Sequence, residues 1–414
     1  TMMEIHQMIA RGLNDRPKYA HIADRIAPWF VAVVLVIATC TLGFWLWYDA
    51  PRALPNLISV LIVTCPCALA LATPVALSIS AGRFARLNVL PMRMAALEPL
   101  SKATMIAFDK TGTLTMGRPI VAAQHQIGKP GALNTLAIAA ALEAKSEHPF
   151  AHALRSEAAK QQVDVSLKTT VRNYPGQGVE AEIDGVSWRL GGEGFTLQDR
   201  GALPEKAQAW QRNQIAEGRS VVVLADADQA IALFAFEDEL RKNAQESIEK
   251  LRRAGYGKFV IVSGDNPESV RILANKIGIE TAIGGLKPNQ KLAWVQEQQA
   301  KGERVVMVGD GINDAPILTA ADAAVSFSGA TDLARQSSDF VILGADLSSL
   351  SGIFKLSSAT RKIILQNLSW AAGYNLLAVP AAAMGYIPPW AAAIGMSVSS
   401  LLVVSNAMRL RKVD

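Results

Sequence analysis

Two aspartates stand directly after short apolar runs, in surroundings suited to phosphoryl chemistry. Asp109 begins the string Asp-Lys-Thr-Gly-Thr-Leu-Thr after the apolar residues 105–108. A carboxylate that follows a buried strand projects into the crevice at the sheet edge and can attack phosphorus as a nucleophile. Asp310 lies in Gly-Asp-Gly-Ile-Asn-Asp-Ala-Pro after the apolar residues 305–308. Because Mg²⁺ held by carboxylates neutralises charge in phosphoryl transfer, we expect Asp109 and Asp310 to ligate Mg²⁺, with Asp314 supporting them.

Two further motifs could complete a cradle for a transferred phosphoryl group. Ser263 opens Ser-Gly-Asp after the apolar residues 259–262, and Lys291 closes Lys-Pro-Asn-Gln-Lys. Each motif alone is a commonplace surface feature, but a hydroxyl and an ammonium on one sheet edge would stabilise phosphoryl oxygens. Thr111 and Asn313, from the first two motifs, are further catalytic candidates, and Thr111 is also a candidate Mg²⁺ ligand.

The tripeptide Cys65-Pro66-Cys67 could bind a soft metal ion, since it lies in the middle of a long uncharged segment. Pro66 has no N–H, so the carbonyl of Ile62 loses its helical partner and the helix must kink or unwind there. Two thiols beside such a break suit Cu(I) or Zn²⁺ rather than Ca²⁺ or Na⁺. The alternative is that both cysteines are small packing residues of a membrane helix.

The second apolar block, residues 363–408, contains Tyr374-Asn375 and Met396 with Ser399 and Ser400, but no Asp, Glu, Lys, Arg or His. A divalent ion held by two thiolates would be helped by a carboxylate, which is conspicuous inside a membrane when present. Its absence favours a monovalent soft ion, and a Met thioether suits Cu(I). Met396 could instead be a lipid-facing filler.

The elements that must position these residues are spanning helices and a soluble middle. Half of the 414 residues are apolar, and the apolar residues concentrate near the two ends. Residues 26–48 and 53–82 are uncharged and each exceeds the roughly 20 residues that cross a bilayer, with a short outer loop at residues 49–52. The second block is broken at residues 385–389 and is long enough for two more spans. Buried helices of a soluble core are the alternative reading.

Lysines and arginines flank these blocks on the sides that would face the cytoplasm, which places both chain ends there. The net charge of +5 and pI near 9.0 come without a basic stripe interleaved with aromatics, so we expect no nucleic-acid partner. Three cysteines supply no disulfide framework, as suits a reducing compartment.

The middle of the chain alternates short apolar runs with helical patterns, which is typical of a doubly wound α/β sheet. Residues 119–235 interrupt this alternation and read as an inserted α+β domain. We therefore assign residues 83–118 and 236–362 to the α/β domain, 26–82 and 363–408 to two transmembrane hairpins, and 409–414 to a tail.

Along the chain, the four motifs that begin at Asp109, Ser263, Lys287 and Gly309 follow one another in the order in which they resemble the phosphorylation domain of P-type ATPases, within the haloacid-dehalogenase superfamily. The resemblance implies that ATP phosphorylates Asp109. The family's third motif begins with Thr where this chain has Ser263, which retains the hydroxyl.

Two motifs of the insert resemble the nucleotide-binding domain of the heavy-metal branch: Ser146-Glu147-His148-Pro149 and Gly176-Gln177-Gly178-Val179. The resemblance implies that Glu147 and His148 orient adenine, while Gly176 and Gly178 let the chain pass close to the nucleotide. That branch usually has Gly-Asn further along the chain, where this sequence reads Gly191-Gly192. The asparagine amide is therefore missing from this side of the expected nucleotide site.

The Cys-Pro-Cys string resembles the signature of heavy-metal P-type ATPases, and the Tyr-Asn and Met-x-x-Ser-Ser pairs resemble its Cu(I) branch. The Zn²⁺/Cd²⁺ branch typically carries Lys and Asp in these helices. The resemblance implies ATP-driven export of Cu(I) or Ag(I) across the cell membrane and a soluble copper donor. The implied ion ligands are Cys65, Cys67, Tyr374, Asn375, Met396 and Ser400. Residues 391–410 resemble the subgroup that supplies copper to haem–copper oxidases.

The family's actuator domain carries a Thr-Gly-Glu loop, and this chain has no such tripeptide. We interpret residues 1–25 as the link from that domain, the chain as a fragment, and four further spanning helices as preceding it. Such a fragment should form a phosphoenzyme without efficient turnover. The competing hypotheses are a Zn²⁺/Cd²⁺ pump, a membrane-anchored Mg²⁺-dependent phosphatase, which needs neither the insert nor the cysteines, and a non-enzymatic metal-binding membrane protein.

Overall fold

The computed structural model describes residues 18–65, 67–128, 134–146, 148–165, 170–174, 176–310, 314–327, 337–344 and 346–413, with side chains from residue 32 onward. Three residues singled out in the sequence lie outside this described part: Pro66, Glu147 and Asn313. The same holds for most of the expected linker.

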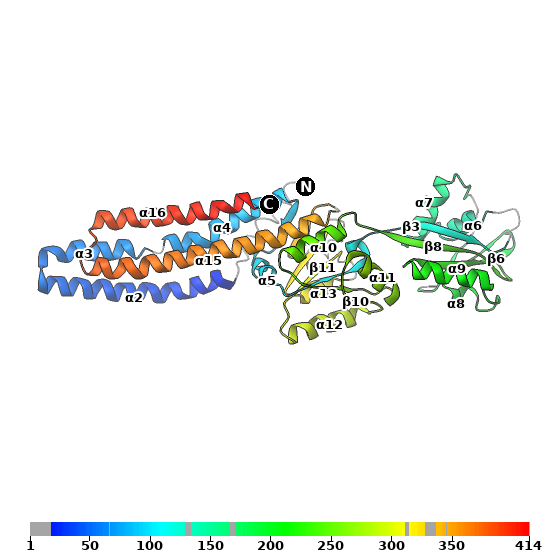
Figure 1. Cartoon of the computed structure of the whole chain (residues 1–414), viewed down its shortest axis with the longest axis horizontal. Helices are drawn as coiled ribbons and strands as arrows, with labels where there is room; N and C mark the ends of the chain where they lie inside the picture. The colour runs from blue at the N-terminus through cyan, green and yellow to red at the C-terminus, as the bar shows by residue number, and fades with distance from the viewer. Residues whose placement is uncertain are drawn as a thin grey trace.

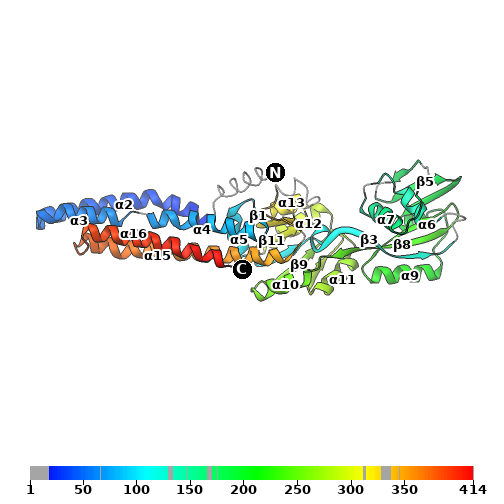
Figure 2. The same cartoon turned by 90° about the horizontal axis from the view of Figure 1, so that it is seen from above.

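The two apolar blocks form a bundle of long helices at one end of the molecule, with the α/β domain next to it and the inserted domain at the far end (Figures 1 and 2). The bundle consists of α2 (Lys18–Tyr48), α3 (Ala50–Val63), α4 (Cys67–Arg86), α15 (Ser348–Ala383) and α16 (Pro389–Met408). Only Asp49 separates α2 from α3, so the expected outer loop over residues 49–52 is wrong. Pro51 does not prevent the earlier helix start, since proline is tolerated in a first turn.

Polar side chains fasten the two helical hairpins to each other. Trp45 Nε1 donates to the carbonyl of Ala383 at 2.9 Å, and the hydroxyls of Ser80 and Thr360 lie 2.7 Å apart. Such bonds replace water for polar groups buried between apolar helices. They hold α2 and α4 against α15.

Within the described residues, two helical stretches are long and apolar enough to cross a membrane, Ala50–Arg86 and Pro389–Lys412. In α2 the described side chains leave a shorter apolar piece, Ala32–Tyr48. The apolar half of α15 is interrupted by Gln366, Asn367 and Asn375, which lower its mean hydropathy. The expectation of four spans therefore stays a prediction.

The soluble middle contains a seven-stranded sheet with β2 (Met105–Phe108) near its centre. The strand order is β1-β13-β12-β11-β2-β9-β10, and only β1 (Val89–Pro91) runs antiparallel to its neighbour. The other strands are β9 (Lys258–Val262), β10 (Thr281–Ile283), β11 (Val305–Gly309), β12 (Ala323–Phe327) and β13 (Phe340–Ile342). The strands on either side of β2 are almost entirely buried apolar residues, as a sheet covered on both faces requires.

Helices cover both faces of this sheet, which confirms the doubly wound α/β fold. One face packs on α10 (Ala244–Arg253), α11 (Pro267–Ile277) and the start of α15. The other packs on α12 (Pro288–Ala300) and α13 (Ala315–Ala320). The first core continues into Leu77 and Phe84 of α4, so the bundle and the α/β domain share buried side chains.

The inserted domain is a six-stranded antiparallel sheet of order β3-β8-β7-β6-β5-β4. Its strands are β3 (Thr115–Gln126), β4 (Arg172–Tyr174), β5 (Gly178–Ile183), β6 (Val186–Gly191), β7 (Ser220–Ala225) and β8 (Ala230–Leu240). On one face lie α6 (Thr135–Leu142) and α7 (Pro149–Lys160), and on the other α8 (Glu193–Thr196) and α9 (Glu205–Ala216). The long strands β3 and β8 extend past residues 119 and 235 and connect the two domains.

Candidate functional site

The carboxyl ends of three neighbouring parallel strands gather the predicted catalytic residues. Asp109 follows β2, Asp310 follows β11 on one side, and Ser263 follows β9 on the other. Parallel strands end at the same sheet edge, which is why motifs some 200 residues apart meet. The sequence predicted this meeting from the apolar runs alone.

A buried lysine bridges two aspartates at this edge. Lys291 Nζ donates to Asp109 Oδ1 at 2.7 Å and to Asp314 Oδ1 at 2.8 Å. All three side chains are less than a tenth exposed. Lys291 comes from the first turn of α12 and Asp314 precedes α13, so the helices on one face of the sheet supply the partners of Asp109.

Oxygen atoms of Asp109, Asp310 and Asp314 lie within 4.8 Å of one another. Lys291 and, near Asp310, Arg241 balance part of the charge of these carboxylates. Their oxygens are hard ligands of the kind that Mg²⁺ prefers. The residues present therefore fit a hard divalent cation.

Electrostatics tune both members of the central ion pair. Burial, reinforced by Asp314 and opposed by Lys291, raises the pKa of Asp109 to about 7. Burial disfavours the Lys291 ammonium, but the attraction of Asp109 and Asp314 outweighs it and raises the pKa of the lysine. Near neutral pH the Asp109 side chain is therefore partly protonated and partly ionised. A cation bound beside it would favour the ionised carboxylate.

Arg241 fixes the loop that follows Asp109, and the sequence analysis missed it. Its Nε donates to the carbonyl of Thr113 at 2.8 Å and its Nη2 to that of Gly112 at 2.6 Å, while its guanidinium lies 4.2 Å from the ring centre of Phe327. No local motif marks this residue. Arg241 follows β8, and it reaches the Gly112–Thr113 loop because β8 pairs antiparallel with β3, which begins after that loop.

Asp238, on β8, closes the same junction from the other side. Its carboxylate accepts from Thr115 Oγ1 at 2.5 Å and from the Arg118 N–H at 3.1 Å. Asp238 and Arg241 together tie the connecting strands to the loop of Asp109. An acidic strand end could have been noticed in the sequence, but its partners could not.

The hydroxyls of Thr111 and Ser263 both form hydrogen bonds with Asp265. Thr111 Oγ1 donates to Asp265 Oδ2 at 3.3 Å, and the Asp265 N–H donates to Ser263 Oγ at 3.2 Å. Lys110 Nζ forms an ion pair with Asp265 at 2.8 Å. The Thr111 hydroxyl is thus bonded to Asp265, and Thr111 as a Mg²⁺ ligand stays a prediction.

Gly112 allows the close approach of Asp310. Its φ is +72°, and a Cβ would overlap Asp310 Oδ2 and lie 2.9 Å from Asp310 Cγ. We expect Gly112→Ala to displace this carboxylate and weaken Mg²⁺ binding roughly tenfold, the loss of one charge-assisted ligand. Mg²⁺ titration followed by thermal shift measures it.

Gly278→Ala is the matched control for Gly112→Ala. Gly278 has nearly the same φ, +76°, with nothing within 4 Å of a Cβ, so it reports backbone strain alone. Equal Mg²⁺ affinities in the two variants would show that crowding of Asp310 is not the reason for the glycine.

The nucleotide candidates lie on separate elements of the inserted domain. His148 caps α7, and its Nδ1 accepts the Phe150 N–H at 3.3 Å. Gly176 has φ +76° and open space around it. A Cβ on Gly178 would instead overlap the Leu190 carbonyl oxygen and lie 2.8 Å from the Phe195 ring, so packing inside the domain accounts for this glycine.

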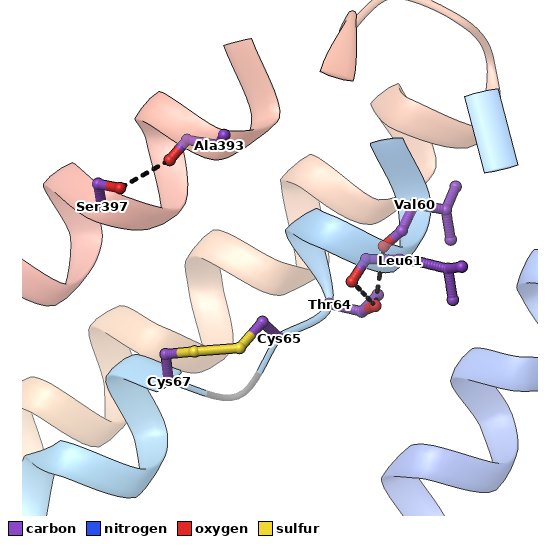
Figure 3. Close-up of a disulfide and its surroundings, with 7 residues drawn as sticks. All are labelled: Val60, Leu61, Thr64, Cys65, Cys67, Ala393 and Ser397. Atoms are coloured by element: carbon purple, nitrogen blue, oxygen red, sulfur yellow. Dashed lines mark hydrogen bonds between the residues drawn. A yellow bond between two sulfur atoms is a disulfide. The ribbon is translucent and has the colours of Figure 1, made fainter. Parts of the chain in front are cut away.

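The cysteine pair lies at a break between α3 and α4, which confirms the predicted unwinding. The carbonyl of Ile62 accepts the Cys65 N–H at 3.2 Å, so a tighter turn satisfies it. The Thr64 hydroxyl donates back to the carbonyls of Val60, at 2.8 Å, and Leu61, at 3.1 Å (Figure 3).

The two cysteines form a disulfide in the structure, contrary to the expectation of free thiols (Figure 3). The break brings their Cα atoms to 5.4 Å, within the range that a disulfide spans. The bonded pair offers no thiolate, so a metal ion requires its reduction. The same proximity would let both thiolates reach one ion.

Helix α16 passes beside the cysteines with Ala393 and Ser397 (Figure 3). Met396 and Ser400 share this helical face by their spacing. Ser397, which the sequence analysis did not select, donates to the Ala393 carbonyl at 2.9 Å. Ser399 faces elsewhere, since it accepts the Trp370 Nε1–H at 3.1 Å.

On α15, the Tyr374 hydroxyl packs against α16, where a Cβ on Gly395 would lie 2.7 Å from it. Asn375, the next residue, is half-buried. The described contacts therefore place Tyr374 at the α15–α16 interface. Met396 and Ser400 as ion ligands stay a prediction that rests on their spacing along α16.

Comparison with known proteins finds matches along nearly the whole chain. The profile of haloacid dehalogenase-like hydrolases matches residues 104–322, more than half of the chain. Copper-exporting P-type ATPases of Staphylococcus aureus strains Newman and COL are each 34% identical over 415 residues, covering 99% of this chain and 51% of the relative. The chain thus spans about half the length of the curated relatives it matches.

Solved structures give the same picture. A zinc-transporting PIB-type ATPase in the E2.Pi state aligns with a TM-score of 0.75 at 30% identity, covering 99% of this chain and 67% of that one. The catalytic domain of the CPx-ATPase CopB-B aligns with a TM-score of 0.54 at 26% identity, covering 66% of this chain and 98% of that one.

Proposed function

Because the chain belongs to the heavy-metal P-type ATPases, with a haloacid dehalogenase-like phosphorylation domain, we propose that ATP phosphorylates Asp109 to drive a soft monovalent metal ion across a membrane. The observation that carries this proposal is the buried cluster in which Lys291 bridges Asp109 and Asp314 beside Asp310. Such a cluster combines a nucleophile with the charges that phosphoryl transfer needs.

In the proposed reaction, a carboxylate oxygen of Asp109 bonds to the γ-phosphorus of ATP, and the bond from that phosphorus to the β–γ bridging oxygen breaks. The electron pair leaves with ADP. Lys291 holds Oδ1 of Asp109, which leaves Oδ2 as the attacking atom, and its ammonium balances the incoming phosphoryl charge. Mg²⁺, when bound by Asp109, Asp310 and Asp314, would neutralise further charge on the phosphate oxygens.

We assign ATP binding to the inserted domain. His148, at the start of α7, and Gly176, in open space before β5, are the residues on which the assignment rests, together with Glu147 from the same motif as His148. Gly178 supports the site by packing on Phe195. The catalytic domain of CopB-B changes conformation upon nucleotide binding, which supports nucleotide binding by the corresponding part of this chain.

Cu(I) or Ag(I) is the cargo that the bundle favours. Reduced Cys65 and Cys67 are soft ligands, Met396 adds a thioether, and residues 363–408 contain no carboxylate for a divalent ion. Tyr374, Asn375 and Ser400 complete the proposed path. The copper-exporting relatives support this choice, whereas the zinc-transporting structure supports Zn²⁺ as the second candidate.

We further propose four spanning helices with both ends of this segment in the cytoplasm, export of the ion to the far side, and delivery by a soluble copper donor. The basic ends of the apolar blocks, such as Arg86 at the end of α4 and Arg409 after α16, support this orientation.

Metal-dependent phosphorylation tests the proposal. The chain in lipid, kept reduced with a phosphine, is labelled from [γ-³²P]ATP with Mg²⁺ and with Cu(I), Zn²⁺ or no transported ion. We expect acid-stable, hydroxylamine-labile label that rises with Cu(I) in the parent but not in Cys65→Ser, because one thiolate cannot replace two. Cys40→Ser, which removes an exposed cysteine elsewhere in α2, should behave like the parent.

The other outcomes discriminate among functions. Label that rises with Zn²⁺ and not with Cu(I) would identify a divalent-metal pump. Label independent of metal and of Cys65 would break the link to transport and leave a phosphatase-like site.

A further inference from the structure

A serine at the junction of the two soluble domains connects the residue after the nucleophile with the nucleotide-binding insert. Ser269 lies in the first turn of α11, on the phosphorylation domain. Its Oγ accepts a hydrogen bond from Lys110 Nζ at 2.9 Å and donates one to the Gly218 carbonyl at 3.0 Å. Gly218 belongs to the inserted domain, in the turn between α9 and β7.

Lys110 is held firmly at its end of this chain of hydrogen bonds. Its side chain is 13% exposed, and its ammonium also pairs with Asp265 at 2.8 Å. Lys110 directly follows Asp109 in the chain. Its ammonium is positioned by Asp265 and Ser269. Ser269 is the one of these two that also touches the insert.

The Gly218 end is equally well defined. Gly218 has φ +85°, and a Cβ there would lie 3.3 Å from Ile272 Cγ2, so only glycine lets the turn settle on α11. Arg219 stiffens the turn through Glu217 at 2.6 Å and Glu237 at 3.1 Å. The hydroxyl of Ser269 therefore joins two rigid surfaces.

Strand register shows which end of the insert is docked. Gly178 pairs with Gly191, and Gly191 pairs with Val223, three residues from the start of β7. The glycines of the nucleotide motif thus lie toward the same end of the sheet as the Gly218 turn. Docking this turn on α11 keeps that end facing the phosphorylation domain.

We propose that Ser269 is a positioning residue that holds the nucleotide-binding domain against α11 and transmits its orientation to Lys110 beside Asp109. The proposal rests on the proposed function for its kinetic consequence, but not for the docking itself. With the hydrogen bonds in place, the insert presents its nucleotide end and Lys110 keeps its ammonium at the domain junction. Without the hydroxyl, the Gly218 carbonyl loses this donor, and among the described residues Lys110 keeps its ion pair with Asp265.

Inter-domain distances test the docking directly. Nitroxide labels are attached to unnatural amino acids introduced at Gln161, on the insert, and at Lys301, on the phosphorylation domain. This chemistry leaves the native cysteines unlabelled. We expect pulsed electron–electron double resonance to give one narrow distance distribution in the parent and in Ser269→Thr, which keeps the hydroxyl. Ser269→Ala should broaden it.

Ser247→Ala is the matched control. Ser247 is buried in α10 of the same domain, and its hydroxyl has no hydrogen-bond partner within the described residues. Its removal should leave the distances unchanged. An unchanged distribution in Ser269→Ala, or equal broadening in Ser269→Thr, would overturn the proposal.

The kinetic readout separates positioning from general damage. We expect the single-turnover rate of phosphorylation at saturating ATP to fall roughly threefold to tenfold in Ser269→Ala, the equivalent of one hydrogen bond. The dissociation constant of ATP, measured at equilibrium, should stay within about twofold of the parent, since the hydroxyl touches the docking surface and not the nucleotide motif.

A faster rate in Ser269→Ala, or a weaker ATP affinity that accounts for the whole loss, would contradict the positioning role. A parent chain without any phosphoenzyme would remove the proposed function, while the distance measurement would still decide the docking.

Discussion

Asp109→Asn is expected to abolish the phosphoenzyme while leaving the fold intact. The amide keeps the size of the side chain and can accept from Lys291, but it cannot form an acyl phosphate. The label from ATP should fall to background, a loss of at least about 10³-fold, the scale on which removal of a nucleophile acts. Labelling with Mg²⁺ and the activating metal measures it.

The same substitution should stabilise the domain in a pH-dependent way. Burial raises the folded-state pKa of Asp109 from 3.8 to about 7, so the folded state binds more protons than the unfolded state between these values. The contribution of this group to the free energy of unfolding therefore falls as pH rises from about 4 to about 7. Above that range the full cost of burying an ionised Asp109 is present. Asparagine has no such cost, so its melting temperature relative to the parent should rise from pH 5 to pH 8 without Mg²⁺.

Asp346→Asn is the control for Asp109→Asn. Asp346 lies on the same domain and accepts from Asn243 and Ser348, which lowers its pKa. It should keep the phosphoenzyme, and its stability should show the opposite trend, a disadvantage that is present at neutral pH and disappears in acid. Label retained in Asp109→Asn would show that another residue is the nucleophile.

Much of the site followed from the sequence because its residues stand at the ends of apolar strands. Strand ends of a parallel sheet meet at one edge, so Asp109, Asp310 and Ser263 could be brought together without knowing the strand order. The break at the cysteines was equally accessible, since proline removes a specific hydrogen bond. In both cases a local rule determines the relevant geometry.

The residues that were missed act through contacts between distant segments. Arg241 binds backbone carbonyls that any sequence would offer, and Ser269 reaches Gly218 only because two domains dock. The disulfide was missed for a different reason: the tight turn at the break sets the distance between Cys65 and Cys67, and that turn has no sequence signature beyond the proline.

Lys291→Met is expected to cause the second large effect, because it leaves the carboxylate cluster without its buried cation. Methionine has a similar length, so little cavity is created. Removing one partner of a buried ion pair costs about 3–5 kcal/mol, and here two carboxylates lose their partner. Phosphorylation should fall roughly 10²-fold or more, as when a donor to a developing phosphoryl charge is removed.

Chemical denaturation across pH distinguishes charge from packing. The lysine stabilises the ionised carboxylates, and Asp109 is increasingly protonated as the pH falls below its pKa of about 7. The stability difference between parent and Lys291→Met should therefore be largest near pH 8 and shrink toward pH 5. Lys301→Met, which removes an exposed pair with Glu297, should cost less than about 1 kcal/mol.

Added Mg²⁺ gives the decisive comparison for Lys291. A divalent cation bound by Asp109, Asp310 and Asp314 would take over part of the charge balance, so Mg²⁺ should recover more stability in Lys291→Met than in the parent. Mg²⁺ should not restore phosphorylation. In the transition state the Lys291 ammonium is still needed to hold Asp109 Oδ1. A loss of stability that is independent of both pH and Mg²⁺ would mean that Lys291 acts by packing, and the cluster would then owe its geometry to the strands and helix ends alone.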